Sequence, residues 1–127
     1  MEIVAIVAAL ALIEYGVFVV LCGQARGHYG VAAPSTTGNT AFERRFRVQA
    51  NTIEQLVIFL PGLLLFAVYV SEPIAAGLGM VFVVGRALYA RAYLVDPAKR
   101  GPGFLLTVVS NTTLLAGGLV GAIVALF

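Results

Sequence analysis

Four long apolar stretches, separated by shorter polar connections, make up nearly the whole chain. They run from Ile3 to about Gln24, from Arg47 to Val70, from Ile74 to Leu94 and from Phe104 to Phe127. Each is close to the roughly twenty residues that a helix needs to cross a bilayer core about 30 Å thick. The pattern predicts an all-α protein, an integral membrane four-helix bundle in which residues 1–127 form a single four-span domain.

The second stretch differs from the others because its apolar part, Leu56 to Val70, has only fifteen residues. To span a bilayer, this helix has to include the polar residues that precede it. Arg47, Asn51 and Glu54 then lie at the membrane boundary, and their spacing of i, i+4 and i+7 puts them on one helix face. Ionisable groups at that depth usually face a bundle interior or a water-filled cavity. The stretch therefore predicts one wall of a polar site at a membrane surface.

The composition supports a membrane protein, since the chain is 61% hydrophobic and only 11% charged. A soluble domain carries about a quarter charged residues, and the mean hydropathy here is +1.00. The single cysteine, Cys22, excludes an intramolecular disulfide and any cysteine-rich metal cluster, and we expect no metal cofactor. The net charge of +2 gives no reason to invoke a nucleic-acid partner.

The basic residues predict the orientation of the chain in the membrane. All eight flank the first and third connections, whereas the opposite side offers only Glu2 and Glu72. Because basic residues accumulate on the cytoplasmic side, we expect these two connections in the cytoplasm and both termini outside. The eight are Arg26, Arg44, Arg45, Arg47, Arg86, Arg91, Lys99 and Arg100.

The third stretch carries a second polar face at the same membrane level. Arg86, Tyr89 and Tyr93 are spaced i, i+3 and i+7. The tyrosines also suit an aromatic belt at the boundary, and Arg100 also suits a simple cytoplasmic anchor. Taken together, however, the arginines outnumber the nearby carboxylates, which predicts an anionic ligand with carboxylate or phosphate groups.

The fourth stretch contains Gly117 and Gly121, a small-xxx-small pair that permits close helix approach. Such a pair serves packing within one subunit or association between subunits. We interpret it as packing within one subunit.

These residues resemble the MAPEG family, the membrane-associated proteins of eicosanoid and glutathione metabolism, and in particular its prokaryotic-type members. The resemblance covers the chain from about Arg26 to the end of the fourth stretch, including the distance from Arg26 to Pro34. Its most specific motif is Arg47-x-Gln49-x-Asn51-x-x-Glu54, preceded by Pro34-Ser-Thr-Thr-Gly38 and Phe42-Glu43-Arg44. A second is Arg86-x-x-Tyr89-x-x-x-Tyr93, with Arg100 seven residues further on.

The resemblance implies a homotrimer in the membrane, by expectation a bacterial inner membrane, with glutathione in clefts between subunits on the cytoplasmic side. Arg100 matches the arginine assigned to thiolate stabilisation in leukotriene C synthase and would be the catalytic residue. The implied activity is that of a glutathione transferase or peroxidase acting on lipophilic electrophiles, with a role in detoxification. The residues implied to bind glutathione, the co-substrate, are Arg26, Arg47, Gln49, Asn51, Glu54, Tyr89 and Tyr93.

Two positions depart from leukotriene C synthase. Gly27 stands where that enzyme has a second arginine, and Gln55 stands where it has a tyrosine. Leukotriene specificity is therefore not expected. The sequence leaves open the electrophile, the choice between transfer and peroxide reduction, and whether glutathione or another small thiol is the donor.

Two other functions remain as alternatives. The first is a non-catalytic lipid-binding scaffold on the same fold, like the lipoxygenase-activating member of the family. The second is a small proton-coupled multidrug exporter, suggested by four spans in a short chain and a lone intramembrane Glu14. The exporter gives no role to Arg47, Asn51 and Glu54, and we instead expect Glu14 to pair with a polar or cationic group inside the bundle.

Overall fold

A computed structural model describes all of residues 1–127, and all of its regular secondary structure is helical. The elements are α1 (Glu2–His28), α2 (Thr40–Tyr69), α3 (Glu72–Val95), the short 3-10 helix η1 (Pro97–Lys99) and α4 (Gly101–Val124). All four α-helices are long and apolar enough to cross a membrane, which confirms the predicted all-α, four-span architecture. The largest difference from the predicted boundaries is in α2, which begins at Thr40 and not at Arg47.

The early start of α2 follows from a helix cap in the polar stretch. The side chain of Asn39 accepts a hydrogen bond of 3.1 Å from the backbone N–H of Phe42, which satisfies one of the unpaired donors of the first turn. The residues from Thr40 to Glu54 are therefore helical throughout. As a result, Arg47, Asn51 and Glu54 do lie on successive turns of one helix.

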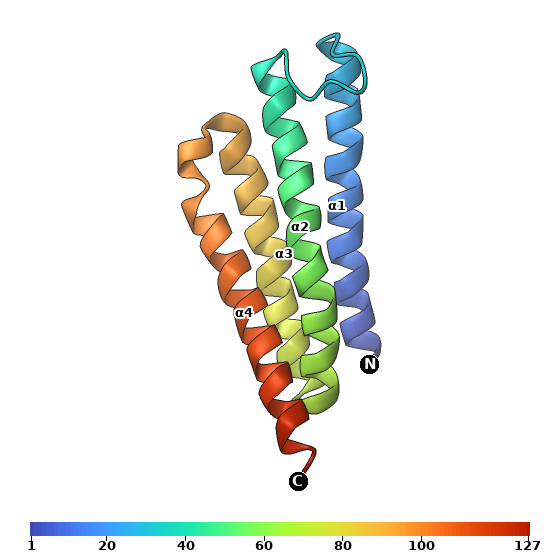
Figure 1. The fold of residues 1–127 in the computed structure, drawn as a ribbon, viewed down its shortest axis with the longest axis vertical. Helices are drawn as coiled ribbons and strands as arrows, with labels where there is room; N and C mark the ends of the chain where they lie inside the picture. Colours follow the sequence, from blue (N-terminus) through green and yellow to red (C-terminus); the bar gives the residue numbers. More distant parts are fainter.

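The bundle has α2 and α3 at its centre, with α1 packed against both on one side and α4 against both on the other (Figure 1). Successive helices alternate in direction, so the α1–α2 and α3–α4 connections share one end of the bundle and both termini lie at the other (Figure 1). The basic residues of the two connections are thus gathered at one end. That this end faces the cytoplasm stays a prediction of the charge pattern.

The core lies between α2 and α3, where the rings of Phe59 and Phe82 stack with centroids 3.9 Å apart. Leu63 and Leu114 are fully buried beside them. The outward faces of all four helices carry exposed leucine, isoleucine and valine side chains. An apolar surface that extensive is typical of contact with lipid or with further subunits.

Glycines let α4 lie very close to its neighbours. A Cβ atom on Gly117 would come within 2.5 Å of Cε2 of Phe66, and one on Gly121 within 2.8 Å of the carbonyl oxygen of Tyr69. Both contacts are with α2 of the same chain, which confirms that this pair packs within one subunit. The tightest approach is at Gly103, where a Cβ would lie 2.3 Å from the backbone nitrogen of Tyr89.

We expect Gly103→Ala to separate α3 from α4 and to lower the thermal unfolding midpoint in detergent by about 5 °C or more, since overpacking of this kind costs about 1–3 kcal/mol. Gly101→Ala is the matched control, because a Cβ there meets no atom within 4 Å. Circular dichroism melts of the two variants check this. Equal midpoints would show that the helix pair tolerates the added methyl group.

Candidate functional site

The candidate site is built around a buried arginine on α3. The side chain of Arg86 is fully buried, and its Nη2 donates hydrogen bonds to Oδ1 of Asn51, at 2.9 Å, and to Oγ1 of Thr52, at 2.8 Å. Its guanidinium carbon lies 4.1 Å from the ring centroid of Tyr89, within cation–π range. Arg86 therefore fixes α2 against α3 at the height of Asn51.

Thr52 is a member of this network that the sequence did not single out. Its hydroxyl donates to the carbonyl oxygen of Val48 at 2.7 Å and accepts the bond from Arg86. A threonine that bonds back to the preceding turn is common in helices. Its position beside Asn51 gave no signal that it would meet a buried arginine.

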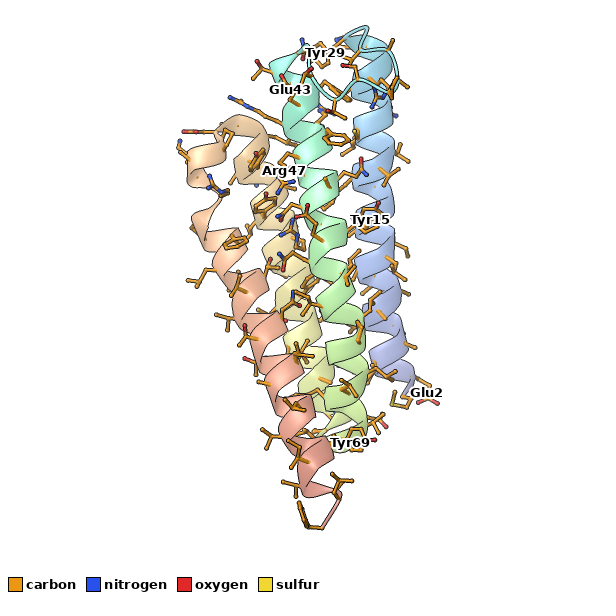
Figure 2. All side chains as sticks on the ribbon, viewed as in Figure 1. Glu2, Tyr15, Tyr29, Glu43, Arg47 and Tyr69 are labelled. Carbon is orange, nitrogen blue, oxygen red and sulfur yellow. The ribbon has the colours of Figure 1, made fainter.

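The exposed layer of the site consists of Arg47 and Glu54. Two guanidinium–carboxylate contacts join them, Nη1 to Oε1 at 3.3 Å and Nη2 to Oε2 at 3.5 Å, while Nδ2 of Asn51 lies 3.5 Å from Oε2 of Glu54. Figure 2 shows Arg47 on α2 in the half of the bundle that carries the connections. The side chains of Arg47 and Glu54 are 48% and 53% exposed, so both remain open to a ligand. Asn51 thus links a buried cation to an accessible ion pair.

The two tyrosines of α3 lie next to this network. Tyr89 is buried against Val48 of α2, and its ring stacks on that of Tyr93 with centroids 5.4 Å apart. The charges of Arg47, Arg86 and Arg100 all act on the Tyr89 side chain. Tyr89 therefore joins the predicted residues of α2 to those of α3.

Three predicted residues have other surroundings. Arg26 stacks over the ring of Phe42 at 4.7 Å and donates from Nη1 to the carbonyl oxygens of Ser35 and Val31, so its guanidinium orders the first connection. Arg100 is exposed and donates to the carbonyl oxygen of Pro97 at 2.8 Å. Gln49 is half-buried on α2, and its side chain makes no hydrogen bond. Their binding of a ligand stays a prediction.

Positive charge at this end of the bundle exceeds the available carboxylates. The pair formed by Arg47 and Glu54 is the one salt bridge between two side chains in the chain. Arg44, like Arg26 and Arg100, donates only to backbone carbonyls. Guanidinium groups held by neutral acceptors keep their full charge, which favours a ligand that carries carboxylates.

An apolar groove of about 510 Å³ lies on the outer side of α2 and α4. Ile58, Val108 and Leu115 are among its lining residues. Inside this groove, Nδ2 of Asn111 donates a hydrogen bond of 3.0 Å to Oε1 of Gln55. Gln55, one of the two positions that differ from leukotriene C synthase, therefore has a partner on α4. The volume is in the range of ligand pockets, and the walls suit a lipophilic molecule.

The fold and the charged side chains define a four-span membrane protein with an arginine-rich polar site at one end. The MAPEG family model matches residues 4–120, and the chain belongs to the MAPEG family.

Several relatives are similar over most of their length. An uncharacterized protein of Synechocystis is 51% identical over 115 residues, covering 91% of this chain and 84% of that protein. Human microsomal glutathione S-transferase 2 is 36% identical over 106 residues, covering 84% and 72%. Bovine leukotriene C4 synthase is 34% identical over 77 residues, covering 61% and 51%.

Proposed function

We propose that this protein is a membrane-bound glutathione S-transferase that acts on lipophilic electrophiles. The single observation that carries the proposal is the continuous network from buried Arg86 through Asn51 to the open pair of Arg47 and Glu54. It presents hydrogen-bonding groups of both charge signs beside a surplus of arginines. The similarity to proteins named microsomal glutathione S-transferase supports the same activity.

Glutathione matches this set of groups chemically. It has two carboxylates, one amine and one thiol. Arg47 binds one carboxylate as a fork, with Gln49 and Tyr93 beside it, while Arg26 meets the other where subunits adjoin. Glu54 binds the amine, and Asn51 holds Glu54 in place through the contact described above. Tyr89, whose ring lies against the guanidinium of Arg86, forms the floor of the glutathione site.

The reaction begins at the glutathione sulfur. A thiol with a pKa of about 8.5 becomes a thiolate near neutral pH when a cation lies beside it, and Arg100 supplies that cation. With an aryl halide, the sulfur forms a new carbon–sulfur bond and halide leaves. With a lipid hydroperoxide, the sulfur takes the terminal oxygen and the lipid alcohol is released. A second glutathione then converts the sulfenic acid to glutathione disulfide and water.

The second substrate reaches the sulfur from the lipid phase. The groove between α2 and α4 opens on the outer side of the bundle, and it is lined largely by apolar side chains. We infer that the protein is a homotrimer in the inner membrane, with the cleft completed by a neighbouring subunit and facing the cytoplasm. The half-exposed Arg47 and Glu54 support this arrangement, since such a pair at membrane depth needs a polar neighbour.

We expect Glu54→Ala to weaken glutathione binding about tenfold or more, because it removes the carboxylate that meets the ligand amine and releases Arg47. Isothermal calorimetry of the purified protein in detergent measures this. Glu43→Ala is the matched control: Glu43 is a glutamate of the same helix that forms no salt bridge, and we expect its removal to leave the affinity unchanged. Equal affinities for wild type and Glu54→Ala would remove the role assigned to Glu54.

A second candidate is a lipid-binding scaffold without catalysis, which the α2–α4 groove favours. Calorimetry distinguishes the two functions by which ligand binds, a fatty acid or glutathione. Saturable binding of a fatty acid without any binding of glutathione would establish the scaffold and overturn the transferase.

A further inference from the structure

Glu14 of α1 is a half-buried ionisable group to which the proposed reaction gives no role. Its carboxyl oxygen Oε1 is buried and has no hydrogen-bond partner. Tyr15, the next residue, lies near mid-height of α1, away from both ends of the bundle (Figure 2). A carboxylate at this depth is costly unless a cation or several donors face it.

Arg86 of α3 lies at the height of Glu14. Helices α1 and α3 run in the same direction and contact each other (Figure 1). Phe18, one turn above Glu14, packs in the cluster of Ala90, which is one turn above Arg86. Glu14 and Arg86 are therefore level, and the charge of each acts on the other.

Arg86 has unused donors of its own. Nη2 is occupied by Asn51 and Thr52, but Nε and Nη1 are buried without any partner. Besides Glu14, the acidic residue whose charge acts on Arg86 is Glu54, which is half exposed and already paired with Arg47. A fully buried guanidinium without an anion is strongly unfavourable, so a second carboxylate is required on the α1 side.

We propose that Glu14 is the counter-ion of Arg86, bridged to it by buried water, and that through Arg86 it is a positioning residue for Asn51. Oε1 of Glu14 with Nε and Nη1 of Arg86 supply the two to four polar partners that a buried water needs. The pairing rests on these unpartnered buried atoms and on the equal height of the two residues, and it does not depend on the proposed function. Its effect on ligand binding rests on the proposed function. Glu14 thus connects α1 to the polar site on α2 and α3.

The pairing is tested by a double-mutant cycle on thermal stability, with Glu14→Gln, Arg86→Met and the double variant. Glu14→Gln leaves Arg86 uncompensated, and we expect the midpoint to fall by about 5 °C or more. In the Arg86→Met background the same change removes a carboxyl that has lost its partner, and the midpoint should stay level or rise. Equal decreases in both backgrounds would overturn the pairing. If Arg86→Met does not fold, Arg86→Lys takes its place in the cycle. Lysine lacks the planar fork of arginine, so we expect the coupling between positions 14 and 86 to be smaller but of the same sign.

The positioning role is tested by a second cycle, on the affinity for glutathione measured by calorimetry. We expect Glu14→Gln to weaken binding about tenfold in the wild type and less than twofold in Asn51→Ala, since its effect passes through Asn51. Glu14→Asp, which keeps the charge, should restore part of the affinity. Glu2→Gln is the control, because Glu2 is the other acidic residue of α1 and its side chain is 97% exposed.

The outcomes separate this inference from the proposed function. If wild type binds no glutathione while the stability cycle shows coupling, the function fails and the ion pair stands. If glutathione binds but the Glu14→Gln effect is the same with and without Asn51, the positioning role is overturned. Additive stability effects overturn the pairing whatever the ligand result.

Discussion

Replacing Arg100 by alanine should lower glutathione conjugation at neutral pH by about ten- to a hundredfold while leaving glutathione binding nearly intact. An adjacent opposite charge lowers the pKa of an ionising group by about 1–3 units. Its loss raises the thiol pKa, so the thiolate that is present above that pKa becomes scarce at pH 7. The acid limb of the rate profile should therefore move to higher pH, with activity partly restored near pH 9. The assay is conjugation to a generic aryl halide as a function of pH, with binding followed by calorimetry.

The control for this experiment is Lys99→Ala. Lys99 is the neighbouring cation, at the end of η1, and like Arg100 it is exposed. We expect its rate profile to match wild type. If Arg100→Ala keeps both the wild-type rate and the wild-type profile, the thiolate is stabilised elsewhere, and Arg100 is an anchor at the membrane surface.

The second large effect is expected for Arg86→Met. This change removes the bonds to Asn51 and Thr52 and leaves Glu14 without its cation, so we expect unfolding to become easier by about 3–5 kcal/mol. Asn51 is no longer held toward α3, and glutathione binding should weaken as well. Denaturant or thermal unfolding in detergent, together with calorimetry, measures both effects.

Arg91 provides the matched comparison. It is a second arginine of α3, little more than one turn away, but it is exposed and makes no hydrogen bond. Arg91→Met should change stability by no more than about 0.5 kcal/mol. If the two variants proved equally stable, the contacts of Arg86 would not be what holds α2 against α3 at the site.

Much of the α2 part of the site was accessible from the sequence. The helical period places Arg47, Asn51 and Glu54 on one face, and the structure has the contacts among them. The boundary of α2 was less accessible, because the residues before the membrane are polar and the cap at Asn39 lies outside the apolar pattern. Such a cap depends on one local hydrogen bond, which hydropathy does not register.

The other parts of the site depended on how the helices meet. Nothing in the pattern assigned Arg26 to the carbonyl groups of its own connection, or Thr52 to Arg86. The sequence predicted a polar or cationic neighbour for Glu14 inside the bundle, and Arg86 is the cation that we propose for it. The identity of that neighbour requires the relative height and rotation of α1 and α3.

The sequence by itself determined four membrane spans, the gathering of basic charge at one end and the shared face of Arg47, Asn51 and Glu54. These properties follow from hydropathy, charge placement and the 3.6-residue period, all of which are local. Only the tertiary structure decided that Arg86 is buried between Asn51, Thr52 and Tyr89, and that Gly103 lets α4 lie against the backbone of Tyr89. Contacts between helices depend on rotation, depth and close approach, which are set by the packing of the whole bundle and not by any single stretch.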